Sequence, residues 1–357
     1  MSMNLERQAA VLARLRFVAL AAIVAWSVRL SAAAAEPTTL GIDGSRFTLN
    51  GKPTFLLGLS YYGALGARED FIRRDLDDAK RYGFNWLRVW ATWESFGNDV
   101  SAVDSRGQPR QPFMDRLKWL VAECDHRGLV VDVTLTRGKR LSDATPVGHL
   151  PDVESHQRAV ETVVNALKQH RNWYLDVANE HDVRDERYVP LAELKDLREA
   201  VRRIDASRLV TASFGGHELG ERDVRDALVT AGLDFLSPHR PRNSESPAET
   251  EARTRECHTL MMQIGRVVPV HYQEPFSRGY AGWEPTAADF LTDLRGAVTG
   301  GAAGWCFHNG SQGDAPNKEP RRSFDLRNKR LFDQLDAGEQ KVVGSAAVDL
   351  RPSAKLK

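Results

Sequence analysis

Short apolar runs alternate along the chain with stretches in which apolar residues recur every three or four positions. Eight such runs occur, with centres about 25 to 44 residues apart. They begin at Phe55, Asn85, Leu129, Trp173, Leu209, Leu233, Arg266 and Gly301. Because the runs are apolar almost throughout rather than at alternate positions, we expect strands that are covered on both faces, as in a parallel sheet.

The stretches between the runs predict helices. The periodicity is clearest where Phe113, Leu117, Leu120, Val121 and Cys124 fall on one helical face. Eight strand–helix units predict an α/β protein with a single closed (β/α)8 TIM barrel. A doubly wound sheet is the alternative, but it would require a glycine-rich phosphate-binding turn after an early strand, and residues 58–63 do not match that pattern.

Residues 1–35 have the pattern of a secretory signal peptide. Three arginines precede an apolar run from Phe17 to Val28, and an alanine-rich stretch ends at Ala35, where we expect cleavage. An uncleaved membrane anchor is the alternative, but the run is shorter than the ~20 residues that a spanning helix requires. We therefore expect a secreted or periplasmic protein with no stable membrane insertion after cleavage.

The remaining chain is predicted to hold one barrel domain over residues 36–336, followed by a polar C-terminal tail over residues 337–357. Its opening stretch contains Asn50-Gly51, which is a strong signal for a hairpin turn. Three cysteines are too few for a disulfide scaffold, and Cys124 and Cys306 lie in patterns typical of core residues.

Net charge argues against a polyanionic partner. The whole chain has 49 basic and 48 acidic residues and a formal charge of +1. The predicted leader contains four arginines and one glutamate, so the rest of the chain carries about −2. Such a balance provides no attraction for nucleic acid or an anionic membrane, and a neutral oligo- or polysaccharide suits it better.

Two glutamates stand where a barrel places its catalytic groups, at the carboxyl ends of strands. The fourth run ends in Asn179-Glu180, and the seventh ends in Gln273-Glu274. A pair of carboxyl groups across a pocket is what glycosidic bond cleavage requires, since one donates a proton and the other attacks the sugar or stabilises its charge. The alternative is that each glutamate caps a helix or pairs with an arginine.

These features together resemble clan A glycoside hydrolases, in particular the cellulase-like family 5. The resemblance rests on "FTLNGKPTFLLGLSYY", "GFNWLRVW", the Asn-Glu pair, the second glutamate and "GGAAGWCFHNG", in that order along the chain. It implies a retaining hydrolase of β-glycosidic bonds that needs no cofactor and works by double displacement. Glu180 would be the general acid/base and Glu274 the nucleophile, with the two carboxyl groups about 5–5.5 Å apart.

The resemblance also implies supporting roles in the site. Asn179 would hydrogen-bond the sugar 2-hydroxyl, Arg88 would keep Glu274 ionised, and His239 matches a histidine at the rim of the barrel. The chain departs from the family where the third strand has Asp132-Val133-Thr134 in place of Asp-x-His. It also has Pro241 where the family often carries a tyrosine that touches the nucleophile, a role that Tyr272 or Tyr280 would have to fill.

Aromatic and histidine side chains near the strand ends are candidates for sugar contacts. Tyr62, Trp90, Trp93 and Trp283 are expected to bind the sugar, together with His308, which follows the eighth run. We expect Trp305 to belong to the core. The histidines form neither an H-x-H nor an H-E-x-x-H pattern, so no metal site is predicted. Two alternatives stay open, a catalytically weak carbohydrate-binding barrel and a metal-dependent hydrolase on the same fold.

Overall fold

The structure is a computed structural model that describes residues 36–95, 97–136, 150–184, 187–278, 283–308 and 325–350. The leader predicted at residues 1–35 lies outside these residues. Contacts separate the chain into residues 1–36 and residues 37–357, and the second of these units holds the fold. None of the helices in the described ranges is long and apolar enough to cross a membrane.

Eight parallel strand positions close into a barrel. In chain order they are β4 (Leu56–Ser60), β5 (Trp86–Trp90), β8 (Val130–Thr136), β9 (Trp173–Asn179), β10 (Val210–Thr211) with β11 (Ser213–Phe214), β12 (Ser237–Pro238), β13 (His271–Tyr272) and β14 (Gly304–Phe307). Seven of these strands form one sheet in the order β10-β9-β8-β5-β4-β14-β13. β11 pairs with β12, and a parallel bridge between Leu236 and Val270 joins β12 to β13, which completes the ring. The predicted (β/α)8 fold is confirmed, and every predicted run forms one of its strands.

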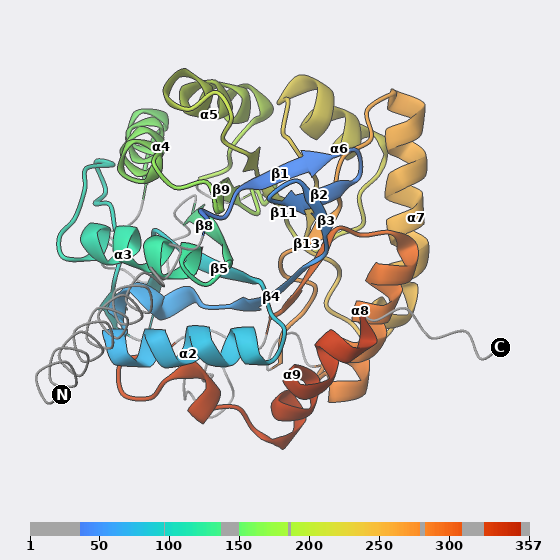
Figure 1. Cartoon of the computed structure of the whole chain (residues 1–357). Coiled ribbons are helices and arrows are strands. Elements are labelled where there is room, and N and C mark those ends of the chain that lie inside the picture. Colours follow the sequence, from blue (N-terminus) through green and yellow to red (C-terminus); the bar gives the residue numbers. More distant parts are fainter. Residues whose placement is uncertain are drawn as a thin grey trace, which may run out of the picture. The chain divides into compact units, whose positions relative to one another are not determined.

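Helices follow the strands and surround them (Figure 1). They are α2 (Glu69–Arg81), α3 (Phe113–Asp125), α4 (Val153–Leu167), α5 (Leu191–Ile204), α6 (Glu221–Arg225) with η2 (Asp226–Thr230), α7 (Ser246–Ile264), α8 (Ala287–Gly300) and α9 (Ala337–Asp349). Shorter elements are η1 (Tyr62–Gly66), β6 (Glu94–Ser95), β7 (Asn98–Asp99) and η4 (Leu331–Asp333). Each helix buries one apolar face against the barrel, as Leu117, Leu120, Val121 and Cys124 do from α3.

The C-terminal segment differs from the predicted polar tail, because most of it is the eighth helix of the barrel. α9 packs on α8, and Val342, Val343 and Ala346 are buried along one of its faces. Asp336 caps the helix and forms a reciprocal capping box with Glu339. The domain therefore extends past residue 336 to the end of α9.

A hairpin closes the amino-terminal end of the barrel. β1 (Leu40–Asp43), β2 (Arg46–Leu49) and β3 (Lys52–Thr54) form an antiparallel sheet. Asn50 and Gly51 both adopt positive φ, as a tight hairpin turn requires, so the predicted turn is confirmed. Phe47 of β2 is fully buried, with its ring 5.0 Å from that of Phe235 and 5.4 Å from that of His271. The hairpin thus acts as a cover over the bottom of the barrel.

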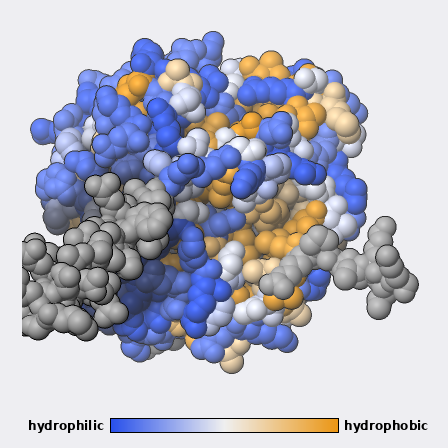
Figure 2. Space-filling model, in the orientation of Figure 1, coloured by the Kyte–Doolittle hydropathy of each residue, from blue (hydrophilic) through white to orange (hydrophobic). Residues whose placement is uncertain are grey.

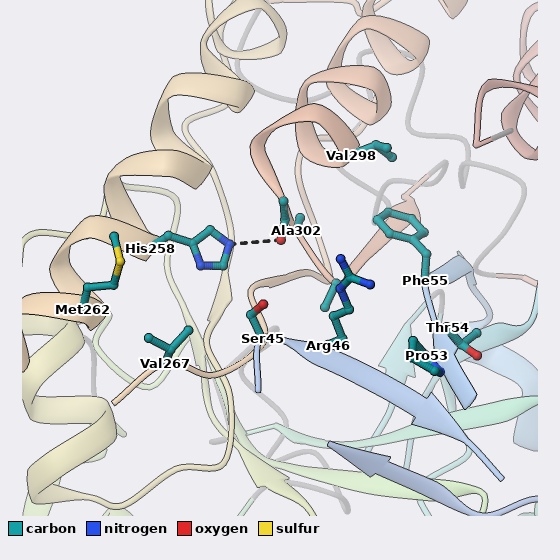
Figure 3. Close-up of a pocket in the computed structure, with 12 residues that line it drawn as sticks. Ser45, Arg46, Pro53, Thr54, Phe55, His258, Met262, Val267, Val298 and Ala302 are labelled. Atoms are coloured by element: carbon teal, nitrogen blue, oxygen red, sulfur yellow. Dashed lines mark hydrogen bonds between the residues drawn. The ribbon is translucent and has the colours of Figure 1, made fainter. Parts of the chain in front are cut away.

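A cavity of about 550 Å3 opens beside this hairpin, away from the carboxyl ends of the strands. Arg46 of the hairpin, His258 of α7 and Val298 of α8 line it, and the His258 ring contacts the Gly301 carbonyl (Figure 3). On the same face of the molecule, apolar residues gather toward the side of α7 and α8, whereas the side of α2 to α5 is mostly polar (Figure 2). Met262, which also lines the cavity, is exposed.

The three cysteines are buried and free. Cys124 lies in α3 and Cys306 in β14, as expected of core residues. Trp305 is likewise fully buried, and its indole donates a hydrogen bond of 2.6 Å to Asp293 of α8.

Candidate active site

The two glutamates meet at the carboxyl end of the barrel. Glu180 follows β9 and Glu274 follows β13, and His239 follows β12. One carboxylate oxygen of each glutamate and one ring nitrogen of His239 all lie within 4.8 Å of one another. Glu274 and His239 are buried and Glu180 is partly exposed, so solvent reaches the cluster from the Glu180 side.

Glu180 is fixed by an unusual backbone conformation. Its φ is 49°, in the left-handed region that side chains other than glycine rarely adopt. The Ser213 hydroxyl lies 3.1 Å from the Glu180 backbone nitrogen and accepts its hydrogen, and the Ser213 carbonyl accepts from the next residue at 3.0 Å. These bonds hold the sharp turn at the end of β9, and strained backbone that the surrounding structure holds in place is common at functional sites.

Glu274 is held at both of its carboxylate oxygens. Arg88 of β5 and the Tyr62 hydroxyl of η1 both donate to Oε1. Arg242, in the loop after β12, donates to Oε2 at 3.1 Å. The Nε2 atom of His308 lies 3.8 Å from the same oxygen. With 5% of its surface exposed, Glu274 is a buried carboxylate whose charge is met by cations on two sides.

Arg88 organises the floor of the site. It is fully buried and donates through Nη2 to Asp176 at 3.0 Å and to the Asn179 side-chain oxygen at 2.9 Å. Its Nε lies 3.2 Å from both Asp132 and Thr134. Since a guanidinium only donates, the contact fixes the Asn179 amide with its oxygen toward Arg88 and its NH2 group turned away from Arg88.

The contacts of His239 define which ring nitrogen carries the proton when the ring is neutral. Its Nε2 faces Nη1 of Arg88 at 3.4 Å, and because Arg88 cannot accept, Nε2 must accept. Nδ1 then bears the hydrogen and donates to Glu180 Oε1 at 3.2 Å, with Glu274 Oε2 at 3.6 Å. His239 therefore bridges the two glutamates from the interior of the barrel.

Burial and neighbouring charge act in opposite directions on the glutamates. Burial raises the pKa of Glu274, but the electrostatic attraction of His239, Arg88 and Arg242 lowers it by more, and the net result is a pKa well below the usual range. Burial also raises the pKa of Glu180, yet the hydrogen bond and charge of His239 lower it more. In the free protein both glutamates are therefore ionised at neutral pH.

The aspartates around Arg88 behave differently. Burial raises the pKa of Asp132 and of Asp176, although the charge of Arg88 opposes this shift. Three carboxylates share one guanidinium, and the aspartates are the groups that take up a proton most readily. A proton that binds to these three carboxylates therefore goes to an aspartate, and Glu274 stays ionised.

Aromatic side chains form one wall beside Glu274. The Tyr62 ring lies 5.0 Å from that of Trp90 and 5.2 Å from that of Trp93, and the two tryptophan rings are 5.0 Å apart. All three are at least nine-tenths buried. His308 continues this wall, with its Nδ1 2.8 Å from the Ser60 hydroxyl and 3.1 Å from that of Tyr62. Burial lowers the pKa of His308 to about 3, so its ring is neutral.

Most of the predicted site residues thus come together, and Tyr272 does not. Tyr272 points out of the barrel, where its hydroxyl meets that of Thr254 on α7 at 2.7 Å, so its expected place in the site is wrong. Trp283 packs edge-on against the buried ring of Phe276, two residues after Glu274. Tyr280 lies outside the described residues. Tyr62 makes the contact with the nucleophile candidate that was expected of Tyr272 or Tyr280.

Sequence reasoning missed Arg242 and the roles of Asp132 and Asp176. The aspartates carried a signal, because each is an acidic residue inside an otherwise apolar strand and so requires a buried partner. Arg242 carried none. Arg240 lies two residues earlier and is just as plausible a candidate from the sequence. Its Nη2 instead donates a hydrogen bond to Glu218 Oε1 at 2.8 Å.

Glu180, His239 and Glu274 are of the types that bind metals, and they are close enough to share one ion. Two guanidinium groups already contact the Glu274 oxygens, so a cation placed between the glutamates would meet like charge at short range. The donor set fits a pair of charge-balanced carboxylates better than a metal centre.

Comparison with known proteins identifies the fold. No family model and no curated protein matches the sequence. Among solved structures, a glycoside hydrolase family 5 protein from Bacteroides vulgatus has a TM-score of 0.63 at 16% identity, covering 86% of this chain and 69% of its own. The endo-1,4-β-mannanase of Rhizomucor miehei has a TM-score of 0.61 at 14% identity. The match covers 87% of this chain and 99% of the mannanase.

A third structure, the exo-β-1,4-mannosidase Op5Man5 from Opitutaceae bacterium strain TAV5, has a TM-score of 0.60 at 18% identity and covers 88% of this chain and 64% of its own. All three structures are called glycosidases and share the barrel described above. This chain therefore shares its fold with these glycoside hydrolases at 14 to 18% sequence identity.

Proposed function

We propose that this protein is a retaining glycoside hydrolase that cleaves β-glycosidic bonds with Glu180 and Glu274. The observation that carries the proposal is the approach of the two carboxylates to within 4.8 Å at the ends of the fourth and seventh strands of the barrel. A separation near 5 Å suits direct attack by one carboxylate, whereas an inverting enzyme needs about 6.5–9.5 Å to admit a water molecule.

In the first step, Glu274 attacks the anomeric carbon. Its Oε1 is held by Arg88 and Tyr62, so Oε2 is the oxygen that forms the bond to the sugar. The glycosidic C–O bond breaks as Glu180 donates its proton to the leaving oxygen. In the second step, the Glu180 carboxylate takes a proton from water, the water oxygen attacks the same carbon, and the ester to Glu274 breaks.

The charge of Glu274 connects the two roles of Glu180. While Glu274 is ionised, its negative charge raises the pKa of Glu180 and favours the protonated acid. Once Glu274 is esterified that charge is gone, so Glu180 releases protons more readily and can act as the base. The NH2 group of Asn179, oriented by Arg88, is the candidate donor to the sugar 2-hydroxyl.

β-1,4-Linked mannans are the substrates to test first, because two of the structural neighbours are named as a β-1,4-mannanase and a β-1,4-mannosidase. The wild-type protein and the variants Glu180→Gln and Glu274→Gln are incubated with β-mannan, mannohexaose and a panel of other neutral β-glycans. We expect hydrolysis by the wild type and a loss of at least about 1,000-fold in each variant. Glycan binding without glutamate-dependent cleavage would instead favour a carbohydrate-binding barrel.

A further inference from the structure

Arg242 lies between the two glutamates on the solvent side of the site. Its Nη2 is 3.1 Å from Glu274 Oε2 and 3.8 Å from Glu180 Oε1. His239 contacts the same two oxygens from inside the barrel, at 3.6 and 3.2 Å. The His239 side chain is fully buried, whereas that of Arg242 is 15% exposed. The gap between the carboxylates is thus bounded by a fully buried ring on one side and a partly exposed guanidinium on the other.

In this position Arg242 competes with a sugar for Glu274 Oε2. For attack, the anomeric carbon must come within about 3–3.5 Å of the nucleophilic oxygen. Oε1 of Glu274 is occupied by Arg88 and Tyr62, which leaves Oε2, and an Arg242 nitrogen already lies at that distance from Oε2. His239 is held by Arg88 and Glu180 and has no room to retreat. Arg242 is the group that can leave.

We propose that Arg242 is a positioning residue that holds the place of the reacting carbon in the free protein, and that the bound sugar displaces it. This inference rests on the proposed glycosidase function. The guanidinium places a positive charge between the two carboxylates, where the positively charged transition state of glycoside cleavage would lie. It keeps both glutamates oriented toward the gap until a sugar takes over that role.

Displacement of Arg242 would also favour the protonated form of Glu180, which an acid must have to donate a proton. The charged and titratable groups that face Glu180 in the described part of the site are His239 and Arg242 from the loop after β12, and Glu274 after β13. His239 and Arg242 lower the pKa of Glu180, and Glu274 raises it. When a neutral sugar replaces Arg242, one of the charges that lower the pKa of Glu180 leaves, so this pKa rises.

Kinetic pH profiles of Arg242→Met test this proposal. The pH dependence of kcat/KM reports groups in the free enzyme, and that of kcat reports groups in the substrate complex. If Arg242 occupies the gap only in the free protein, its loss moves the alkaline limb of kcat/KM to higher pH and leaves that of kcat in place. We also expect KM for mannohexaose to fall about fivefold, since no ion pair has to be broken on binding.

Two further variants control the experiment. Arg242→Lys keeps the positive charge on a shorter side chain that ends in an ammonium group. Its KM, and the pH of the alkaline limb of its kcat/KM profile, should lie between those of the wild type and Arg242→Met. Arg253→Met removes an arginine on the exposed side of α7 that pairs only with carboxylates outside the site, and it should leave both profiles unchanged.

The outcomes separate the inference from the function on which it rests. A raised KM, or equal movement of both alkaline limbs, would show that Arg242 stays in the complex and would overturn the inference while the glycosidase proposal stands. Unchanged profiles and KM would overturn it as well. Absence of glutamate-dependent hydrolysis in both wild type and Arg242→Met would overturn the proposed function itself.

Discussion

At the scale of single residues, the site depends on how Glu274 is oriented. Arg88 and Tyr62 converge on one of its oxygens and leave the other facing Glu180. The phenol of Tyr62 is buried, and burial together with the charge of Glu274 raises its pKa well above the ordinary value, so it remains a hydrogen-bond donor. Tyr62 thus orients the Glu274 carboxylate without altering its charge.

Tyr62→Phe removes this donor and should lower kcat/KM by about 10- to 100-fold, because a small misplacement of a reacting group costs about that much. Steady-state kinetics on mannohexaose provide the measurement. The neighbouring Tyr61→Phe is the matched control, since Tyr61 is equally buried but bonds Asp75 of α2, at 2.9 Å. Tyr61→Phe should reduce stability and leave kcat unchanged; equal kinetic losses in both variants would contradict the role of Tyr62.

The residues around Glu274 also show where sequence reasoning succeeds. The proximity of Glu180, Glu274, Asn179 and His239 was predictable because each stands at or just after a strand end, and Arg88 was conspicuous as a charged residue inside an apolar strand. The error at Tyr272 came from ignoring that successive strand residues point to opposite faces. Inward-facing neighbours, His271 and Gln273, contact Tyr174 inside the barrel, and Tyr272 between them faces α7.

At the scale of elements, the eight strands were visible in the sequence because strands that are covered on both faces are apolar without alternation. The eighth helix was not predicted, since Gly344, Ser345 and two alanines dilute its apolar face. Its signals were a capping pair, Asp336 and Glu339, followed by adjacent valines. Tertiary packing against α8 stabilises a helix that intrinsic propensity alone would leave marginal.

The contribution of α9 can be measured with two valines of the same helix. Val343 is 1% exposed and Val348 is 58% exposed. Val343→Ala should lower the free energy of unfolding by about 2 kcal/mol through lost burial and a residual cavity. Val348→Ala should change it by less than about 0.5 kcal/mol. Urea denaturation gives both values, and similar losses in the two variants would mean that α9 does not pack as described.

At the scale of the whole molecule, buried carboxyl groups make stability depend on pH. Burial raises the pKa of Asp293 to about 6, although hydrogen bonds from Thr250 and Trp305 oppose the shift. The folded state therefore binds this proton more tightly than the unfolded state does. Asp293 contributes stability at low pH that is lost as pH rises from about 4 to about 6.

Asp293→Asn resembles the protonated side chain and should remove this dependence. The difference in unfolding free energy between variant and wild type should rise with pH between about 4 and 6, by up to about 3 kcal/mol, and stay level above about pH 7. Thermal or urea unfolding at several pH values provides the measurement. A difference that is constant across this range would show that Asp293 titrates normally in the folded protein.

Covalent trapping of the intermediate tests most directly the claim that Glu274 attacks the sugar. The protein is incubated with 2,4-dinitrophenyl 2-deoxy-2-fluoro-β-mannoside, whose fluorine slows the second step more than the first, and its peptides are then analysed by mass spectrometry. We expect one fluoromannosyl group per chain, attached to the peptide that contains Glu274, and none in Glu274→Gln. A label on any other carboxylate, or an unlabelled protein that still hydrolyses mannohexaose, would contradict the claim.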